Sequence, residues 1–421
     1  MIVIGAGIVG VSTAYELAYR GVNVTLIEER EGAGLGTSYA NGGQLSACEV
    51  SPWPGPEVPR LIVKWLGRHD APLRLRPKLD PDQWIWLTRF LLRCTSSARR
   101  ERIGPNLGLA LLTRERLAAY RSEFAKAGQS FDFDHSSSGI LRIFRDRRIL
   151  SSATEEAGYM ESFGLSQSAL SPMQCVEVEP ALSAALQRGE IAGGLYAPSD
   201  ASGDAHLFSV RLAEGAERLG VKFVKGVTVQ ALETDGKRVR GVRTDQGVIE
   251  GDTLVVAAGT GSIALLKPLG IRSWIYPLKG YSVTLPAPEG ASVVSVTDEA
   301  RKIVVTRLGN RLRAAGQVEV GGYDLTLEEA RARVVLNATT DLFPQVMPEI
   351  DKAEFWCGLR PMTPDGSPVI GRLDPYSNLY INSGHGTLGW TMGAGGSAAL
   401  ADTILGAAPQ PDLTPFSIKR F

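Results

Sequence analysis

The sequence has few residues of the kinds that build disulfide frameworks or metal sites. Only four cysteines and four histidines occur in 421 residues. The cysteines are far apart, form no C-x-x-C pair and show no metal-ligand spacing; they are Cys48, Cys94, Cys175 and Cys357. This excludes a disulfide-stapled fold, gives no support for a metal site and favours reduced cysteines in a cytosolic protein.

Net charge and long apolar runs are also lacking. The 45 basic residues balance the 45 acidic ones, which argues against a nucleic-acid partner. No run of about 18 apolar residues occurs, so no segment is predicted to span a membrane. The first residues already have a strand pattern, which predicts no leader sequence and a cytoplasmic location, with peripheral attachment to a membrane left open.

Glycine is abundant, with 47 residues, and three of them form G-x-G-x-x-G at Gly5, Gly7 and Gly10. The motif lies between a β-branched run and an apolar helical pattern, and a second β-rich run ends on Glu28. The glycines suit a tight turn, close approach to a pyrophosphate and close helix packing. Glu28 follows at roughly the 20-residue spacing of a ribose-binding carboxylate. The pattern predicts a site for FAD or NAD, because an acid there repels the 2′-phosphate of NADP; the alternative is a turn without a ligand.

Two further stretches are predicted to touch the same ligand. The loop from Glu31 to Gly43 is rich in small and amide side chains just after the expected ribose carboxylate. The alternative for this loop is an ordinary surface segment. A buried apolar run from residue 252 ends in Ala257, Ala258 and Gly259, as expected for a strand whose tip contacts a ligand.

A second glycine-rich turn lies near the other end of the chain. Gly384, Gly386 and Gly389 precede a helical pattern of small residues that runs to about Leu405. A helix start there favours an anion, and a reduced flavin carries negative charge over its N1–C2 carbonyl edge, whereas a nicotinamide needs no such site. This favours FAD spanning two remote turns; the alternative is helix packing on glycine and alanine.

Alternating strand patterns between residues 275 and 318 suggest a second, β-rich domain. We therefore predict an α/β protein in which a Rossmann-like FAD-binding domain carries an inserted α+β substrate domain built on a mainly antiparallel sheet. The FAD-binding domain is predicted at residues 1–80, 195–265 and 355–421, and the substrate domain at 81–194 and 266–354.

The segment from 50 to 102 stands out by its aromatic and basic content. It holds four of the seven tryptophans, in and near two short helical stretches at 60–66 and 84–93. Tryptophan with lysine and arginine on a short amphipathic helix suits the surface of an anionic bilayer. The alternative, which is more common for helical aromatics, is that the rings pack on the core and the cations extend outward.

Several separated motifs together resemble the bacterial D-amino-acid dehydrogenase (small subunit) family, within the group of amino-acid, glycine and sarcosine oxidases. They are the Gly5–Gly10 motif with Glu28 and the stretches 37–44, 276–282, 358–371 and 384–392. The resemblance covers nearly the whole chain. It implies a two-domain flavoprotein that oxidises D-amino acids such as D-alanine or D-proline to imino acids, which hydrolyse to 2-oxo acids. It also implies electron transfer to a quinone or another respiratory-chain acceptor, with peripheral attachment to the cytoplasmic face of the inner membrane.

The resemblance also assigns residues to the site. Arg360 matches the arginine that clamps the substrate carboxylate, which suits a planar guanidinium; the alternative is a structural ion pair. Tyr281 is expected as a second carboxylate donor, Lys279 near the flavin and Arg307 as a weaker substrate contact. His385 is an acid/base candidate, although hydride transfer from Cα to flavin N5 needs no protein base, and packing near the flavin is the alternative.

In glycine oxidase a further arginine lies in the last glycine-rich turn, where this chain has Thr387 or Leu388. Arg360 and Tyr281 are therefore expected to bind the substrate carboxylate. Arg313, on a neighbouring strand, is a weaker candidate for the same contact. The residues expected to bind FAD are Gly5, Gly7, Ile8, Val9, Gly10, Glu28, Glu29, Arg30, Thr37, Ser38, Asn41, Gly42, Gly43, Gln44, Val227, Ala257, Ala258, Gly259, Gly358, Arg360, Gly384, Gly386, Thr387, Leu388 and Gly389.

Two other functions stay open at this point. An oxidase of the glycine or sarcosine type would use O₂ as its acceptor, and a non-enzymatic flavoprotein would bind FAD without reacting with amino acids. FAD is expected to bind non-covalently because no cysteine lies in the final glycine-rich turn, and the alternative of a covalent link rests on Cys357. The chirality of the substrate rests on the resemblance alone.

Overall fold

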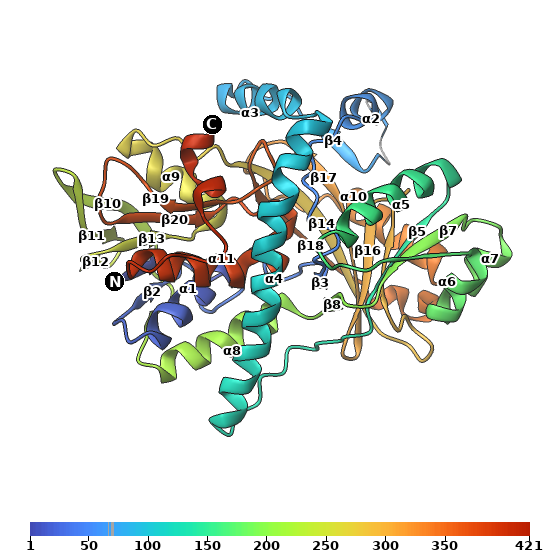
Figure 1. Ribbon diagram of the computed structural model, residues 1–421, viewed down its shortest axis with the longest axis horizontal. Helices are drawn as coiled ribbons and strands as arrows, with labels where there is room; N and C mark the ends of the chain where they lie inside the picture. Colours follow the sequence, from blue (N-terminus) through green and yellow to red (C-terminus); the bar gives the residue numbers. More distant parts are fainter. Residues whose placement is uncertain (66, 69–70) are drawn as a thin grey trace.

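The computed structural model describes residues 1–65, 67–68 and 71–421 and contains two main sheets surrounded by helices (Figure 1). One sheet, with its helices, carries both glycine-rich turns. The other sheet is larger and mainly antiparallel. Leu66, in the first aromatic-basic stretch, lies outside the described residues. The arrangement confirms the predicted α/β class with a second, β-rich part.

The smaller main sheet has six described strands in the order β19-β20-β13-β1-β2-β9. Neighbouring strands are parallel except β19 and β20. Every residue of β1 and β13 is buried, which explains why these strands read as continuous apolar runs. The bounds are β1 Ile2–Ile4, β2 Thr25–Ile27, β9 Lys222–Val224, β13 Leu254–Val256, β19 Val369–Arg372 and β20 Leu379–Ser383, with a separate small sheet of β10 Val229–Asp235, β11 Arg238–Thr244 and β12 Gly247–Glu250.

Four helices form the layers around this sheet: α1 (Ile8–Tyr19), α4 (Ser96–Lys126), α8 (Ala205–Arg218) and α11 (Gly389–Ile404). The small residues of α11 allow close packing. A Cβ at Gly395 would lie 2.2 Å from a carbonyl oxygen of α4. Packing therefore accounts for the glycines inside α11, as the alternative interpretation held.

The larger sheet has nine described strands, with eight in the order β18-β14-β17-β16-β15-β5-β7-β6 and β4 paired to β17. Helix α10 (Glu329–Leu342) covers one face of β14 and β17. The other face meets the loop at 31–43, where a Cβ at Gly42 would lie 3.3 Å from Ala315 Cβ. The strands are β4 Leu73–Leu75, β5 Ile140–Phe144, β6 Ser168–Leu170, β7 Gly193–Ala197, β14 Tyr276–Pro286, β15 Ser295–Asp298, β16 Ile303–Leu308, β17 Arg311–Val320 and β18 Glu354–Met362.

The remaining elements lie outside the two main sheets and the helices named above. The two-residue strands β3 (Gln44–Leu45) and β8 (Ala201–Ser202) pair with each other beside the loop at 31–43. The other helices are α2 Val58–Trp65, α3 Pro81–Leu92, α5 Arg147–Glu161, α6 Pro172–Val178, α7 Ser183–Gln187 and α9 Ser262–Leu266.

The strand pairing divides the chain differently from the predicted segments at a few places. Strands β4 and β18 were expected with the FAD-binding domain but belong to the larger sheet, and β7 crosses the predicted boundary at 194. Helix α4 was expected in the substrate domain but packs on α11. This helix begins at Ser96 and continues through Pro105. Buried strands of both sheets are apolar, so local composition does not say which sheet a strand joins.

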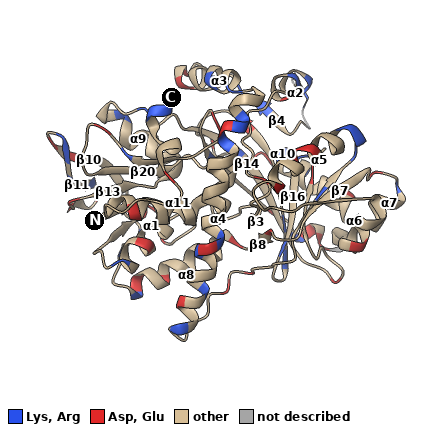
Figure 2. Cartoon of the chain, viewed as in Figure 1, with Lys and Arg blue, Asp and Glu red and all other residues tan. Residues whose placement is uncertain are grey.

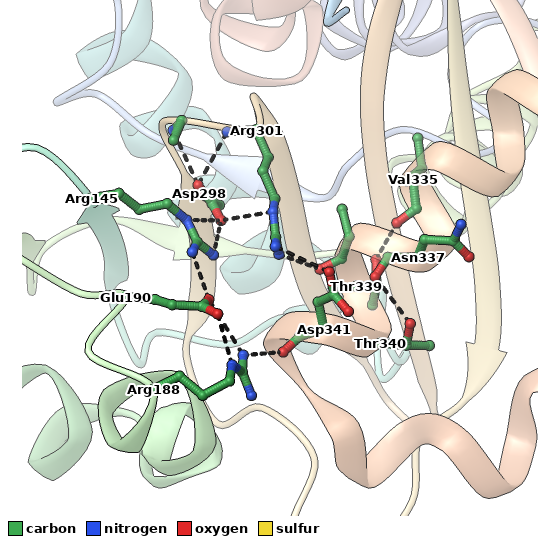
Figure 3. A network of polar contacts seen from close by, with 12 residues as sticks. Arg145, Arg188, Glu190, Asp298, Arg301, Val335, Asn337, Thr339, Thr340 and Asp341 are labelled. Atoms are coloured by element: carbon green, nitrogen blue, oxygen red, sulfur yellow. Dashed lines mark hydrogen bonds and ion pairs between the residues drawn. The ribbon is translucent and has the colours of Figure 1, made fainter. Parts of the chain in front are cut away.

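One buried carboxylate ties the far side of the larger sheet together (Figure 3). Asp298, at the end of β15, is fully buried and accepts hydrogen bonds from Arg145 at 3.2 and 2.9 Å. It also accepts from two backbone amides of the following turn, at 3.0 and 3.2 Å. Arg145 also donates to Glu190, and Arg301 donates to Asp341 of α10. The network therefore joins a strand, a helix and the segment before β7.

Asp298→Ala is expected to lower the free energy of unfolding by about 3 kcal/mol, because it removes a buried ion-pair partner and leaves two amides unsatisfied. Asp298→Asn keeps an oxygen for those amides and should cost less, about 1–2 kcal/mol. Urea unfolding followed by circular dichroism measures both losses. Equal stability of the three proteins would contradict this role for Asp298.

Candidate active site

The first glycine-rich turn leads from β1 into α1. Gly5 has a φ of +98°, and a Cβ at Gly10 would lie 1.7 Å from the Gly5 oxygen, so the turn requires both glycines. The N-cap residue of α1 is Gly7, which has no side chain of its own to cap the helix. Ile8 N donates to Ser38 Oγ at 3.1 Å. The first turn of α1 is thus open to an anionic group at the carboxyl edge of the sheet.

Glu28 follows β2 at the same edge and is buried. Its carboxylate accepts hydrogen bonds from Ala6 N at 2.6 Å and from Arg30 N at 3.1 Å. Glu29 is exposed and pairs with the Arg30 guanidinium at 2.7 Å. Val227 N donates to the Glu28 carbonyl oxygen. The carboxylate is therefore fixed beside the glycine turn, as a ribose-binding acid requires.

The loop at 31–43 connects this edge with the larger sheet. Thr37 Oγ1 donates to a backbone oxygen of β18 at 2.7 Å, and the Gly42 oxygen accepts from a threonine of β16 at 2.7 Å. Asn41 Oδ1 accepts from Gly43 N, which holds the tip of the loop. Gln44 Nε2 donates to two hydroxyls of β15 at 3.0 Å. The small and amide side chains thus fix the loop between the two sheets.

The second glycine-rich turn reaches the same edge from the other end of the chain. Gly384 has a φ of +81°, and no side chain caps the short 3-10 helix Gly386–Leu388 or α11 after it. A serine before the turn donates to the Gly259 oxygen at 3.0 Å. A Cβ at Gly5 would lie 2.8 Å from the Ala257 oxygen. The tip of β13 therefore lies between the two turns.

A cavity lies between the loop at 31–43, the second turn and the larger sheet. The loop at 31–43 and the second turn form one side, and strands β14, β17 and β18 form the other. The described lining residues are Thr37, Ala40, Asn41, Gly42, Gly280, Tyr281, Ala315, Trp356, Gly358, Arg360, Gly386 and Thr387. The cavity therefore brings together residues that are more than 300 positions apart in the sequence.

Arg360 is the only charged side chain among the described lining residues. Its Nη1 donates to the Gln317 oxygen at 3.2 Å, and no described carboxylate lies within ion-pair distance of it. Burial lowers the pKa of Arg360 to about 10, so the guanidinium is still cationic at neutral pH. Even partial burial of a cation without a counter-ion is unfavourable, and a ligand that supplies negative charge removes this cost. The described residues thus offer no carboxylate for the structural ion pair that was the alternative.

The strand register corrects the expectation for Tyr281 and Lys279. Gly280 pairs with Gly358, which puts Gly280 on the same face as Arg360, and residues 279 and 281 alternate to the opposite face. Tyr281 packs towards α10, where burial and then the Glu319 carboxylate raise its pKa. Lys279 Nζ lies 3.6 Å from that carboxylate and donates to the loop before α10. Neither polar group faces the cavity.

The two weaker arginine candidates are also engaged elsewhere. Arg307 is exposed and donates to a backbone oxygen of its own hairpin, so the expected substrate contact is corrected. Arg313 is buried, donates to the Tyr39 oxygen at 3.3 Å and lies 3.5 Å from Asp204. Cys357 lies on the face opposite Arg360 and donates to a backbone oxygen, which removes the support for a covalent flavin link there.

His385 packs beneath α11 and does not line the cavity. Its side chain is buried, and a Cβ at Gly396 would lie 3.7 Å from its Nε2. Burial lowers the pKa of His385 to about 3, so the imidazole is neutral at physiological pH. The expectation of an acid/base role is therefore corrected in favour of packing.

The buried imidazole predicts acid sensitivity. Between about pH 3 and 6.5 the unfolded chain protonates this histidine and the folded chain does not. Because the unfolded state binds one more proton at this histidine, His385 alone lowers the free energy of unfolding by about 1.4 kcal/mol for each pH unit within this range as the pH falls. In His385→Gln the slope of the free energy of unfolding against pH is expected to be smaller by the equivalent of one proton. Urea titrations across that pH range measure the slope. Identical slopes for the two proteins would contradict the assignment.

Several site features are absent from the sequence-based prediction. Trp356 and Ala315 line the cavity, and Gln317 forms a bulge with a φ of +55° whose oxygen holds Arg360. Strained residues of this kind often lie at functional sites. The spacing could have predicted Trp356, because it precedes Arg360 by an even number of residues in one strand and so lies on the same face of the sheet.

A family model described as FAD dependent oxidoreductase matches residues 1–403. The chain belongs to this family. Over 424 aligned residues it is 44% identical to a D-amino acid dehydrogenase of Paramagnetospirillum magneticum, covering 100% of this chain and 98% of that protein. A D-amino acid dehydrogenase of Bradyrhizobium diazoefficiens is 40% identical, with 100% and 98% covered.

The fold of this FAD-dependent oxidoreductase also occurs in a solved L-proline dehydrogenase from P. horikoshii. That structure has a TM-score of 0.76 at 21% identity and covers 100% of this chain and 97% of its own. The two helix starts, with Glu28 fixed beside the first, fit a dinucleotide whose phosphates are anionic and whose flavin becomes anionic on reduction. The family decides for FAD over NAD as the cofactor.

Proposed function

We propose that the protein is an FAD-dependent dehydrogenase that oxidises D-amino acids to imino acids, which hydrolyse to 2-oxo acids. The observation on which this proposal rests is Arg360, a partly buried cation without a carboxylate partner among the described residues, at the cavity beside the second turn. The relatives named D-amino acid dehydrogenase, at 40–44% identity over the full chain, support the substrate class.

The protein acts chiefly by positioning. Arg360 grips the substrate carboxylate through two parallel hydrogen bonds, which fixes the orientation of Cα in the cavity. FAD, when bound, supplies the acceptor for the hydride that leaves Cα. No described lining residue offers a proton-accepting side chain to the cavity, because the Tyr281 hydroxyl lies on the other face of the sheet. The substrate amine therefore enters already neutral or loses its proton to water on binding.

The residues proposed to hold FAD follow from the two turns and the loop between the sheets. The amides of the first turn of α1 take the pyrophosphate, Glu28 takes the ribose and the second turn takes the anionic edge of the flavin. Thr37, Asn41 and Gly42 lie along the cavity between them. Glu29 and Arg30 point to solvent and contribute less, since both are exposed.

Turnover with defined electron acceptors tests the reaction class. D-alanine, D-proline and L-alanine are supplied with a soluble quinone analogue under argon, or with O₂ alone. We expect turnover of the D-isomers with the quinone analogue and slow turnover with O₂. Rapid reduction of O₂ to peroxide would show an oxidase, and no reaction with any amino acid would show a non-enzymatic flavoprotein.

We further propose that helices α2 and α3 rest on an anionic membrane, from which a quinone acceptor is reached. Their inner sides share one apolar cluster with β14 and β17, which includes Trp86 and Phe90. Their outer sides expose apolar side chains, with Val63 at 74% and Leu92 at 72%, and Trp84 is half exposed. Lysine and arginine gather around α2 and β4 (Figure 2). In the described part of the chain no helix is long and apolar enough to cross a bilayer.

Co-sedimentation with vesicles tests this surface. We expect binding to vesicles that contain phosphatidylglycerol, weaker binding at high salt and little binding to pure phosphatidylcholine. Trp84→Ser with Leu92→Ser should reduce the bound fraction, whereas Met173→Ser, at an exposed apolar residue on α6, should not. Equal sedimentation with and without vesicles would contradict the proposal.

A further inference from the structure

Two glycines form a flat floor in the cavity. Gly280 of β14 and Gly358 of β18 are direct cross-strand partners on the cavity face. A Cβ at Gly280 would lie 2.1 Å from Arg360 Nη1, and a Cβ at Gly358 would lie 2.0 Å from the Trp356 ring. The guanidinium therefore lies across the Gly280 position, and the edge of the six-membered ring of the indole lies over the adjacent Gly358 position. Only a residue without a side chain leaves room for either of them.

The indole also reaches the loop that covers the cavity. The Trp356 ring lies 6.3 Å from the Tyr39 ring, which is 41% exposed. Ala315 and Ala40 line the cavity near these rings and leave space in it. The cavity thus has a cationic part over Gly280, an aromatic part over Gly358 and small residues around them.

We propose that Trp356 is the wall of the pocket for the substrate side chain and determines which amino acids are accepted. This rests on the proposed function, in which Arg360 holds the carboxylate. With the carboxylate held over Gly280, the groups on Cα lie within reach of the adjacent indole. An apolar aromatic wall suits small or cyclic aliphatic side chains, such as those of D-alanine and D-proline. A large aromatic side chain competes with the indole for the same space.

Substitutions of the wall test the assignment with two readouts. Trp356→Ala is expected to raise the ratio of kcat/KM for D-phenylalanine over D-alanine about tenfold or more. It should also strengthen binding of the unreactive 3-phenylpropionate relative to propionate, measured by calorimetry with the FAD-loaded protein. Trp356→Phe should shift both quantities in the same direction by a smaller factor, and it decides the test if the alanine variant does not fold.

Gly280→Ala is the matched control, because it displaces Arg360 and leaves the wall in place. It should weaken the binding of 3-phenylpropionate and of propionate by similar factors, and it should lower kcat/KM for both substrates by similar factors. The binding ratio and the kcat/KM ratio should therefore change little. A Trp356→Ala protein whose ratios stay within twofold of the unmodified protein would overturn the inference. Lack of oxidation of any D-amino acid by the unmodified protein would instead contradict the proposed function, while the binding ratios would still test the wall.

Discussion

Replacing Arg360 with alanine is expected to lower kcat/KM for D-alanine on the order of 30- to 5,000-fold. This factor corresponds to a loss of about 2–5 kcal/mol of transition-state stabilisation. The guanidinium is the only charged group among the described lining residues, so its loss leaves the substrate carboxylate desolvated without a partner. The FAD content and the free energy of unfolding should change little, since the side chain has one hydrogen bond, to the Gln317 oxygen. Stopped-flow reduction of the flavin by D-alanine measures the loss.

Arg360→Lys provides a graded control. Lysine keeps the positive charge but cannot form two parallel hydrogen bonds, so the loss should be smaller and should appear in both KM and kcat. An alanine variant with unchanged kcat/KM would contradict the carboxylate clamp.

Gly10→Ala is expected to give a protein that purifies without FAD. Its Cβ would lie 1.7 Å from the Gly5 oxygen, so α1 must move away from β1 and the first turn cannot keep its shape. The amides proposed to bind the pyrophosphate are then displaced, and we expect FAD affinity to fall by more than 100-fold, as when several charge-assisted hydrogen bonds are lost at once. The flavin absorbance of the purified protein and its titration with FAD measure the change.

Two other glycines provide the controls for this change. Gly7→Ala has room in the protein, because the nearest atom to its Cβ is Ser38 Oγ at 3.6 Å, so the protein should fold and bind FAD more weakly. Gly158→Ala, in α5 with no atom within 4 Å of the new Cβ, should keep its full flavin content. A yellow Gly10→Ala protein with ordinary FAD affinity would contradict the assigned role of this turn.

Local patterns predicted the two glycine turns and Glu28, because each depends on a short stretch of sequence, whereas Arg360 was predicted through the resemblance to a known family. The buried tip of β13 was equally visible as an apolar run ending in small residues. The face on which a strand residue lies was harder to predict. Tyr281 belongs to the same stretch as Gly280, and a difference of one residue turns its hydroxyl away from the cavity.

Tertiary packing decided the remaining differences. His385 lies in the second turn, but its ring is directed beneath α11 by packing against Gly396, which no local pattern reveals. Trp356 gains its position from Gly358, whose lack of a side chain matters only once the ring lies over it. The membership of β4 and β18 in the larger sheet depends on pairing between segments far apart in the chain.

Anaerobic reduction of the bound flavin tests the central claim most directly. The claim is that two helix starts from opposite ends of the chain hold one FAD beside Arg360, and that Arg360 binds the carboxylate of the substrate. The purified protein should be yellow, should lose its visible absorbance when D-alanine or D-proline is added without oxygen, and should keep it with L-alanine. A colourless protein that does not take up FAD, or a yellow one that no D-amino acid bleaches, would contradict the account.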